Sequence, residues 1–186
     1  RKALSMLEGT RPSAGVELTQ RRRQAVELLA PNEAADLWHQ RQIDALPDSL
    51  VNQHEPEEIV DMLRRLRRLP SRGAAAWGSY DAEDRTVEFV AGVDHGRGRG
   101  AFSSMAGALS SRGLQIMAAE AHVLADDLLL LRYLATDPDS EGAPPRGRLE
   151  EVAAELAAAV DAEQPPKFRR VWGQDAAEAS RKLTSL

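Results

Sequence analysis

The spacing of apolar residues changes once along this chain, near residue 73. Upstream of this point, apolar residues recur every three or four positions between prolines, which predicts helices. Downstream, they first alternate with polar residues and then return to a helical spacing. The stretch from Thr86 to Thr136 contains the clearest elements of both kinds, so we expect the rest of the chain to support it.

Helices are expected through the first 72 residues. Val16 to Ala30 forms one polar-rich segment, Pro31 stops it, and Asn32 is a suitable N-cap for the next helix, whose apolar residues are Leu37, Trp38 and Ile43. A stronger helix follows Glu55-Pro56, because proline and acidic residues fit a first helical turn. Its apolar positions are Ile59, Val60, Leu63 and Leu66.

Four arginines share this last helix: Arg64, Arg65, Arg67 and Arg68. They suggest phosphate binding. In an acidic chain, however, a solvated helix face whose arginine stems cover apolar surface is the favoured interpretation.

Strands are expected after Gly73. Ala74 to Tyr80 is a weak strand, and residues 81–84 form a turn. The next strand points Val87, Phe89, Ala91 and Val93 to one face. After a loop over residues 94–100, a helical stripe is formed by Phe102, Met105, Ala106 and Leu109, and Gly113 stands at the position of a helix C-cap glycine.

Two further strands are predicted, Leu114 to Leu124 and Leu128 to Thr136. Only three residues separate them, so they must pair antiparallel. A proline-rich loop over 137–147 leads to an amphipathic helix with Leu149, Val152, Ala153, Leu156, Ala157 and Val160 on its apolar face. Val171-Trp172 is too short for a convincing strand, and a short helix is expected over Asp175 to Leu183.

These elements predict an α+β fold. From residue 86 their order is β-α-β-β-α, with a right-handed first crossover, which is the ferredoxin-like plan without an obvious last strand.

Composition narrows the class of protein. The 186 residues are 42% hydrophobic and 28% charged, which suits a globular core, and the net charge of −5 argues against a nucleic-acid binder. Without cysteine there is no disulfide, thiolate zinc site or cysteine nucleophile. No apolar run is long enough to span a membrane, so we expect a cytoplasmic protein. Because the chain starts at Arg1, we expect it to be part of a longer one.

Glycine and arginine alternate from Gly96 to Gly100, after a strand and before a helix. Backbone amides and the helix dipole hold anions in this context. The G-x-G-x-G spacing does not match a dinucleotide fingerprint. A tight strand-to-helix turn and small-ligand binding remain equally open, with catalysis a distant third.

No catalytic constellation is apparent. Gly78-Ser79 with Asp81 and Asp84 superficially resembles a nucleotidyltransferase turn, but the spacing is too tight and a hairpin explains it. Asp137-Pro138-Asp139 suits a surface loop better than a metal clasp. The histidines, His39, His54, His95 and His122, share no metal-ligand spacing.

Residues 87–116 resemble an ACT domain. That pattern has an Asp-x-Pro-Gly-Leu-Phe turn, an Ile-Ala-x-Ala-Leu helix and a Gly-Leu-x-Ile strand entry. Here Gly100 stands at the motif glycine, Phe102 at its aromatic residue, and Arg99 where the proline is expected. The helix and strand entry correspond to Met105 through Ile116.

The flanks resemble protein-PII uridylyltransferase/uridylyl-removing enzymes. The matching stretches are Ala45 to Leu50, Pro56 to Leu66, Asp137 to Asp139, Pro144 to Glu150, Pro165 to Arg169, and Val171-Trp172. The resemblance implies three parts. Residues 1–72 are an arm after an HD domain, 73–172 an ACT-like domain lacking its last strand, and 173–186 a linker toward a second ACT domain.

The resemblance also implies a regulatory, non-catalytic segment that responds to glutamine in the control of nitrogen metabolism. Glutamine is expected at Asp94, Gly98, Arg99, Gly100, Ala101 and Phe102. No cofactor or metal is expected here, although the resembled enzymes use Mg²⁺ in their catalytic domains. The expected partners are the remaining domains and, through them, the PII protein, with no nucleic acid or membrane. The alternatives are a dimerisation module without a ligand and a nucleotide-binding domain at Gly96–Gly100.

Overall fold

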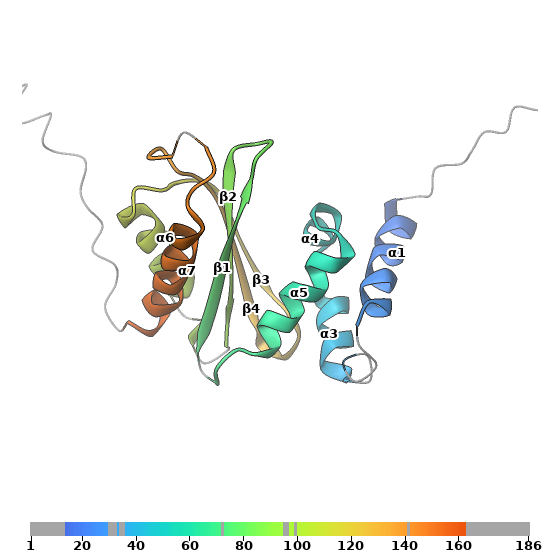
Figure 1. Cartoon of the computed structure of the whole chain (residues 1–186). Coiled ribbons are helices and arrows are strands. Elements are labelled where there is room, and N and C mark those ends of the chain that lie inside the picture. The colour runs from blue at the N-terminus through green and yellow to red at the C-terminus, as the bar shows by residue number, and fades with distance from the viewer. Residues whose placement is uncertain are drawn as a thin grey trace, which may run out of the picture. The chain divides into compact units, whose positions relative to one another are not determined.

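The structure, a computed structural model, describes residues 14–29, 33, 36–71, 73–94, 97–98, 100–140 and 142–162. These residues form helices and a four-stranded antiparallel sheet, so the expected α+β class is confirmed (Figure 1). The chain divides into two compact units. Of the described residues, those up to 68 and residues 123–126 form the helical unit, and those over 69–122 and 127–162 form the sheet unit. Asn32, Val171-Trp172 and the helix expected over Asp175 to Leu183 lie outside the described residues.

Four described helices make up most of the helical unit: α1 (Ala14–Glu27), α3 (Leu37–Ala45), α4 (Asp48–Gln53) and α5 (Pro56–Arg67). The sequence did not predict α4. Helix α3 begins at Leu37 because Asp36 caps it, its carboxylate accepting a hydrogen bond of 3.0 Å from the Trp38 amide. The expectation that Asn32 caps the helix with Leu37, Trp38 and Ile43 is therefore wrong. Of the three apolar residues expected to mark this helix, Ile43 is buried but Leu37 is 68% exposed.

Arg22 on α1 closes the end of α3. Its guanidinium donates to the Leu46 carbonyl at 2.6 Å, the Ile43 carbonyl at 3.3 Å and the Asp48 carboxylate at 2.8 Å. The last carbonyls of a helix have no partner within the helix, so these bonds satisfy them.

Helix α5 has the apolar face that its sequence predicts. The Glu55 amide donates to the Glu58 carboxylate at 3.1 Å, and Pro56 occupies the first helical position. The buried apolar residues of α5 are Ile59, Val60, Met62, Leu63 and Leu66.

The sheet unit contains β1 (Ala74–Asp81), β2 (Thr86–Val93), β3 (Gln115–Val123) and β4 (Leu129–Thr136), in the spatial order β1-β2-β4-β3. Helix α6 (Ala101–Ser111) joins β2 to β3, and α7 (Arg146–Asp161) follows β4. Both helices lie on one face of the sheet (Figure 1). The predicted order β-α-β-β-α from residue 86 is therefore confirmed.

Strand β2 is hydrogen-bonded on both sides. It pairs with β1 from Ala74↔Val93 to Asp81↔Thr86, and with β4 from Val87↔Ala135 to Val93↔Leu129. The sequence was expected to lack the strand that closes the sheet. In the structure β1, upstream of the β-α-β-β-α series, takes the place beside β2.

Alternation places the core between the sheet and its two helices. β2 contributes Val87, Phe89, Ala91 and Val93, each no more than 1% exposed. Burial of each large side chain contributes about 1.5–3 kcal/mol. The other large core residues are Met105, Leu109, Leu114, Leu131, Tyr133, Val152, Leu156 and Val160.

Gly78 lets β1 approach the core aromatic Phe89. The two residues are register partners, and a Cβ at position 78 would stand 2.7 Å from the Phe89 ring. The glycine therefore leaves room for the ring over the strand backbone.

Helix α6 ends as predicted at Gly113, whose φ of 80° is left-handed. The Leu114 amide donates to the Leu109 carbonyl at 3.2 Å and the Gly113 amide to the Ser110 carbonyl at 3.1 Å. These two bonds form a Schellman motif, and the buried Leu109 and Leu114 are its apolar pair.

An ion network crosses three strands. Arg132 on β4 donates to the Glu88 carboxylate on β2, with its Nε at 2.9 Å, and to the Glu120 carboxylate on β3 at 3.2 Å. Glu120 also lies 3.1 Å from His122 Nε2. The hydrogen bond with His122 and the charge of Arg132 hold the pKa of Glu120 below its usual value, although burial opposes this.

None of the helices in the described part of the chain has the length and apolar character needed to cross a membrane.

Candidate functional site

The predicted ligand turn connects β2 to α6. The Asp94 amide donates to the Gly73 carbonyl at 3.0 Å, and the Asp94 carbonyl accepts from the Arg97 amide at 2.9 Å. The Gly98 carbonyl accepts from the Ala101 amide at 3.3 Å. The structure therefore brings Asp94, Gly98, Gly100, Ala101 and Phe102 into one turn. Arg99, also predicted for this site, lies outside the described residues, as do His95 and Gly96.

Gly100 is the N-cap of α6. Its φ of 78° lies in the left-handed region, which favours glycine, and no atom lies within 4 Å of the position that a Cβ would take. Its carbonyl accepts from the Ser104 amide and the Ser103 hydroxyl, each at 2.9 Å. Position 100 is thus restricted by backbone conformation but open in space.

An aromatic pair stands beside this turn. The rings of Phe102 and Tyr133 have centroids 5.5 Å apart and are tilted by 34°. The Tyr133 hydroxyl donates to the Phe102 carbonyl at 2.7 Å. Tyr133 is buried, whereas Phe102 is 40% exposed. Burial raises the pKa of Tyr133, so its hydroxyl remains a neutral donor.

Tyr133 was not among the predicted site residues. Strand alternation places it on the core face with Leu131 and Ala135, which the sequence pattern alone interprets as packing. Its hydroxyl fixes the first turn of α6, so it holds the candidate site in position.

The turn combines three properties. The first amides of α6 and the helix dipole present partial positive charge, the left-handed glycine leaves open space, and an exposed ring lies beside both. This combination suits a small ligand with a carboxylate and an apolar part.

The carboxylates of the two other acidic motifs, at Asp81 and Asp137, accept hydrogen bonds from backbone amides. Gly78 and Ser79 lie inside β1, and the Asp81 carboxylate accepts from the amides of Glu83 at 2.8 Å and Asp84 at 3.3 Å. These bonds shape the β1–β2 hairpin, as the hairpin interpretation predicted.

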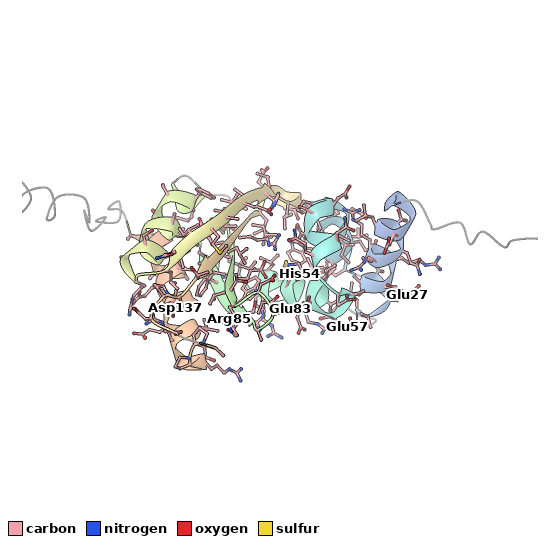
Figure 2. All side chains as sticks on the ribbon, turned by 90° about the horizontal axis from the view of Figure 1, so that it is seen from above. Glu27, His54, Glu57, Glu83, Arg85 and Asp137 are labelled. Atoms are coloured by element: carbon pink, nitrogen blue, oxygen red, sulfur yellow. The ribbon has the colours of Figure 1, made fainter. Side chains whose placement is uncertain are left out.

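The Asp137 carboxylate is bound by a residue at the start of α7. Arg148, in the first turn of α7, donates two hydrogen bonds to the Asp137 carboxylate, from Nε at 2.6 Å and from Nη2 at 3.0 Å. The Asp139 amide and the Ser140 hydroxyl donate to the same carboxylate at 3.1 and 3.2 Å. Figure 2 labels Asp137. Burial acts to raise the pKa of Asp137, but the hydrogen bonds from Arg148 and Asp139 outweigh it and hold that pKa below its usual value.

Each described histidine lies beside a different acidic residue. His54 Nδ1 lies 3.2 Å from Glu58, His122 lies beside Glu120, and His39 is buried near Asp36. Among the described residues, no group of three or more metal-ligating side chains is close enough together to hold an ion.

A search of protein-family models and of curated protein sequences finds no match to this chain.

Proposed function

We propose that this chain is a regulatory, non-catalytic segment that senses glutamine through the β2–α6 turn. In this proposal the β2-α6-β3-β4-α7 series is a ferredoxin-like, ACT-type domain. It belongs to a cytoplasmic protein-PII uridylyltransferase/uridylyl-removing enzyme and takes part in the control of nitrogen metabolism. The nucleotidyltransferase and UMP-removing activities, their Mg²⁺ and contact with the PII protein belong to other domains. The effect of glutamine is then an allosteric coupling to those domains.

The observation that carries the proposal is the left-handed Gly100 at the N-cap of α6. It opens the helix N-terminus directly after a central strand, where the glycine of the ACT turn is expected. The ligand carboxylate is met by the amides of Phe102 and Ser103 in the first turn of α6, and the Phe102 ring covers the aliphatic part. The sheet order supports the same fold, since two helices cover one face and β1 completes the sheet beside β2.

Glutamine binding is tested by calorimetry on the whole chain. Gly100→Asp is expected to abolish the heat of binding, because the added carboxylate repels that of the ligand at the mouth of the turn. Gly100→Asn has the same shape without the charge and tolerates a left-handed backbone, so it is expected to weaken binding less.

Gly113→Asn is the matched control. Its φ of 80° nearly equals that of Gly100, so the backbone strain is similar, but it lies at the other end of α6. It is expected to leave the Kd unchanged. Absence of glutamine binding to the unaltered chain, or equal binding by Gly100→Asp, contradicts the proposal.

A second candidate function is self-assembly through β3. This strand forms one edge of the sheet and exposes several apolar residues: Met117 is 62% exposed, and Ala118, Ala119 and Ala121 are also exposed. Such an edge offers unpaired backbone groups to another strand.

Assembly through β3 predicts a mass that rises with protein concentration in sedimentation equilibrium. Met117→Lys is expected to keep the chain monomeric, because a charged side chain blocks edge pairing. A monomer at all concentrations rules this function out, as does assembly unaffected by Met117→Lys.

The third candidate, nucleotide binding at Gly96–Gly100, has weaker support. Gly98 and Gly100 lie in the turn, whereas Gly96 and Arg99 are outside the described residues. Among the described residues, no group of three or more metal-ligating side chains could hold the metal ion that nucleotide chemistry often uses.

A further inference from the structure

A small pocket lies within the helical unit, separate from the β2–α6 turn. Its volume is about 240 Å³. The end of α5 supplies three arginines, and the start of α3 with its cap supplies a carboxylate and a histidine. The lining residues are Glu33, Asp36, His39, Arg64, Arg67 and Arg68.

Two of the arginines are held in place. Arg64 makes a forked pair with Glu33, its Nε and Nη2 each 2.9 Å from a carboxylate oxygen. Arg67 lies 3.1 Å from Asp36 and stacks over the Trp38 ring at 5.3 Å. A guanidinium has five N–H donors, so each arginine keeps donors that these acids do not use. Fixed donors lose less entropy when a ligand binds.

The described lining residues include three arginines and two carboxylates. Both carboxylates accept hydrogen bonds or ion pairs from Arg64, Arg67 and the Trp38 amide, and Arg64 also lies 3.6 Å from Asp61, which is not among the lining residues. Arg68 extends the row past the end of α5, and its exposed side chain makes no ion pair with any described residue. Arg68 therefore adds to the pocket a positive charge that no described acidic residue offsets.

His39 gives a second, independent indication of a ligand. It is 4% exposed, yet neither ring nitrogen has a hydrogen-bond partner among the described residues. The nearest acceptor, an Asp36 oxygen, is 3.6 Å from Nδ1, which is too long for a hydrogen bond. Buried polar groups nearly always have a partner, so a buried ring without one beside a cationic pocket calls for an anion or a water there.

We propose that this pocket binds the phosphate group of a small molecule. A phosphate offers three or four acceptor oxygens and up to two negative charges, which match several guanidinium groups and a ring N–H better than a single carboxylate does. The volume is below that of common ligand pockets, so the pocket has room for the phosphate group while the remainder of the ligand extends into solvent.

The first test measures binding of inorganic phosphate and of glucose 6-phosphate to the whole chain by calorimetry, with chloride holding the ionic strength constant. Arg68→Gln is expected to weaken binding by about tenfold, the usual effect of losing a charge-assisted hydrogen bond. Arg23→Gln removes the same charge from an exposed position on α1, where Arg23 pairs with Glu27, and is expected to change binding less than about twofold.

Binding of inorganic phosphate alone assigns the site to the free ion, and tighter binding of the sugar phosphate assigns it to phosphate esters. No binding of either, or equal losses in the two arginine variants, overturns the proposal.

The second test separates binding from folding. His39→Met is expected to weaken phosphate binding by about tenfold while the urea midpoint stays the same or rises, because an apolar side chain removes a buried polar group without a partner. Unchanged phosphate binding in His39→Met, whatever its midpoint, shows that the ring serves packing alone and overturns the proposal.

Discussion

Replacing Asp137 with alanine is expected to lower the free energy of unfolding by about 3 kcal/mol at neutral pH, the lower end of the cost of breaking a buried ion pair. The Asp137 side chain is 3% exposed and holds the forked guanidinium of Arg148, which is 30% exposed and so retains some hydration. The loss is measured by urea unfolding. Asp139→Ala is the matched control, because Asp139 is 73% exposed and 3.6 Å from the same arginine, and it is expected to cost less than about 0.5 kcal/mol.

The stability contribution of Asp137 is also expected to depend on pH. The pKa of Asp137 is lower in the folded protein than the ordinary value of 3.8, so its contribution to stability is complete above that value and is lost as the pH falls through the folded pKa. The stability difference between the unaltered chain and Asp137→Ala should therefore shrink below about pH 4. A difference that stays constant down to pH 2 would falsify the assignment of this stability to the ionised carboxylate.

Replacing Arg132 with methionine is expected to cost a similar amount, about 3 kcal/mol. Arg132 and Glu88 are 12% and 18% exposed, so the substitution removes a cation from a largely buried carboxylate. Changing Glu88 to methionine as well should recover most of the loss, because an apolar pair avoids the cost of burying the charges. Urea unfolding of the four members of this double-mutant cycle measures the coupling.

Arg112 provides the control for Arg132. It also bridges two carboxylates, Glu151 and Glu155 on α7, but these side chains are between 35% and 62% exposed. Arg112→Met is expected to cost less than about 1 kcal/mol. Equal costs at Arg112 and Arg132, or additive effects of the Arg132 and Glu88 substitutions, would contradict the view that burial makes the Arg132 network important.

Local pattern was sufficient for the elements of the sheet unit. Alternation located β2, the short break between the two strands predicted after α6 required a hairpin, and Gly113 marked the end of α6. Each of these properties depends on neighbours within a few positions, so the sequence displays it directly. The sequence was less informative about α3, because its start depends on Asp36, whose carboxylate is one of several possible caps in that segment.

Contacts between residues far apart in the sequence could not be predicted from local pattern. Nothing in the alternation of β1 specifies β2 as its partner in the sheet order, or that the closing strand comes from upstream. The contact of Tyr133 with Phe102 joins positions 31 residues apart. The pocket likewise forms only when α5 packs beside the start of α3, so the arginine run alone could not be distinguished from a solvated face.

The position of β1 also determines when the core is covered during synthesis. The four strands of the described sheet lie between Ala74 and Thr136, so this sheet leaves the ribosome before α7 does. α6 then covers only part of the core face, and the rest, toward the edge formed by β1, stays open until Arg146–Asp161 emerges and packs there. For that interval the nascent chain carries a paired sheet with an exposed apolar face, the kind of surface that chaperones bind.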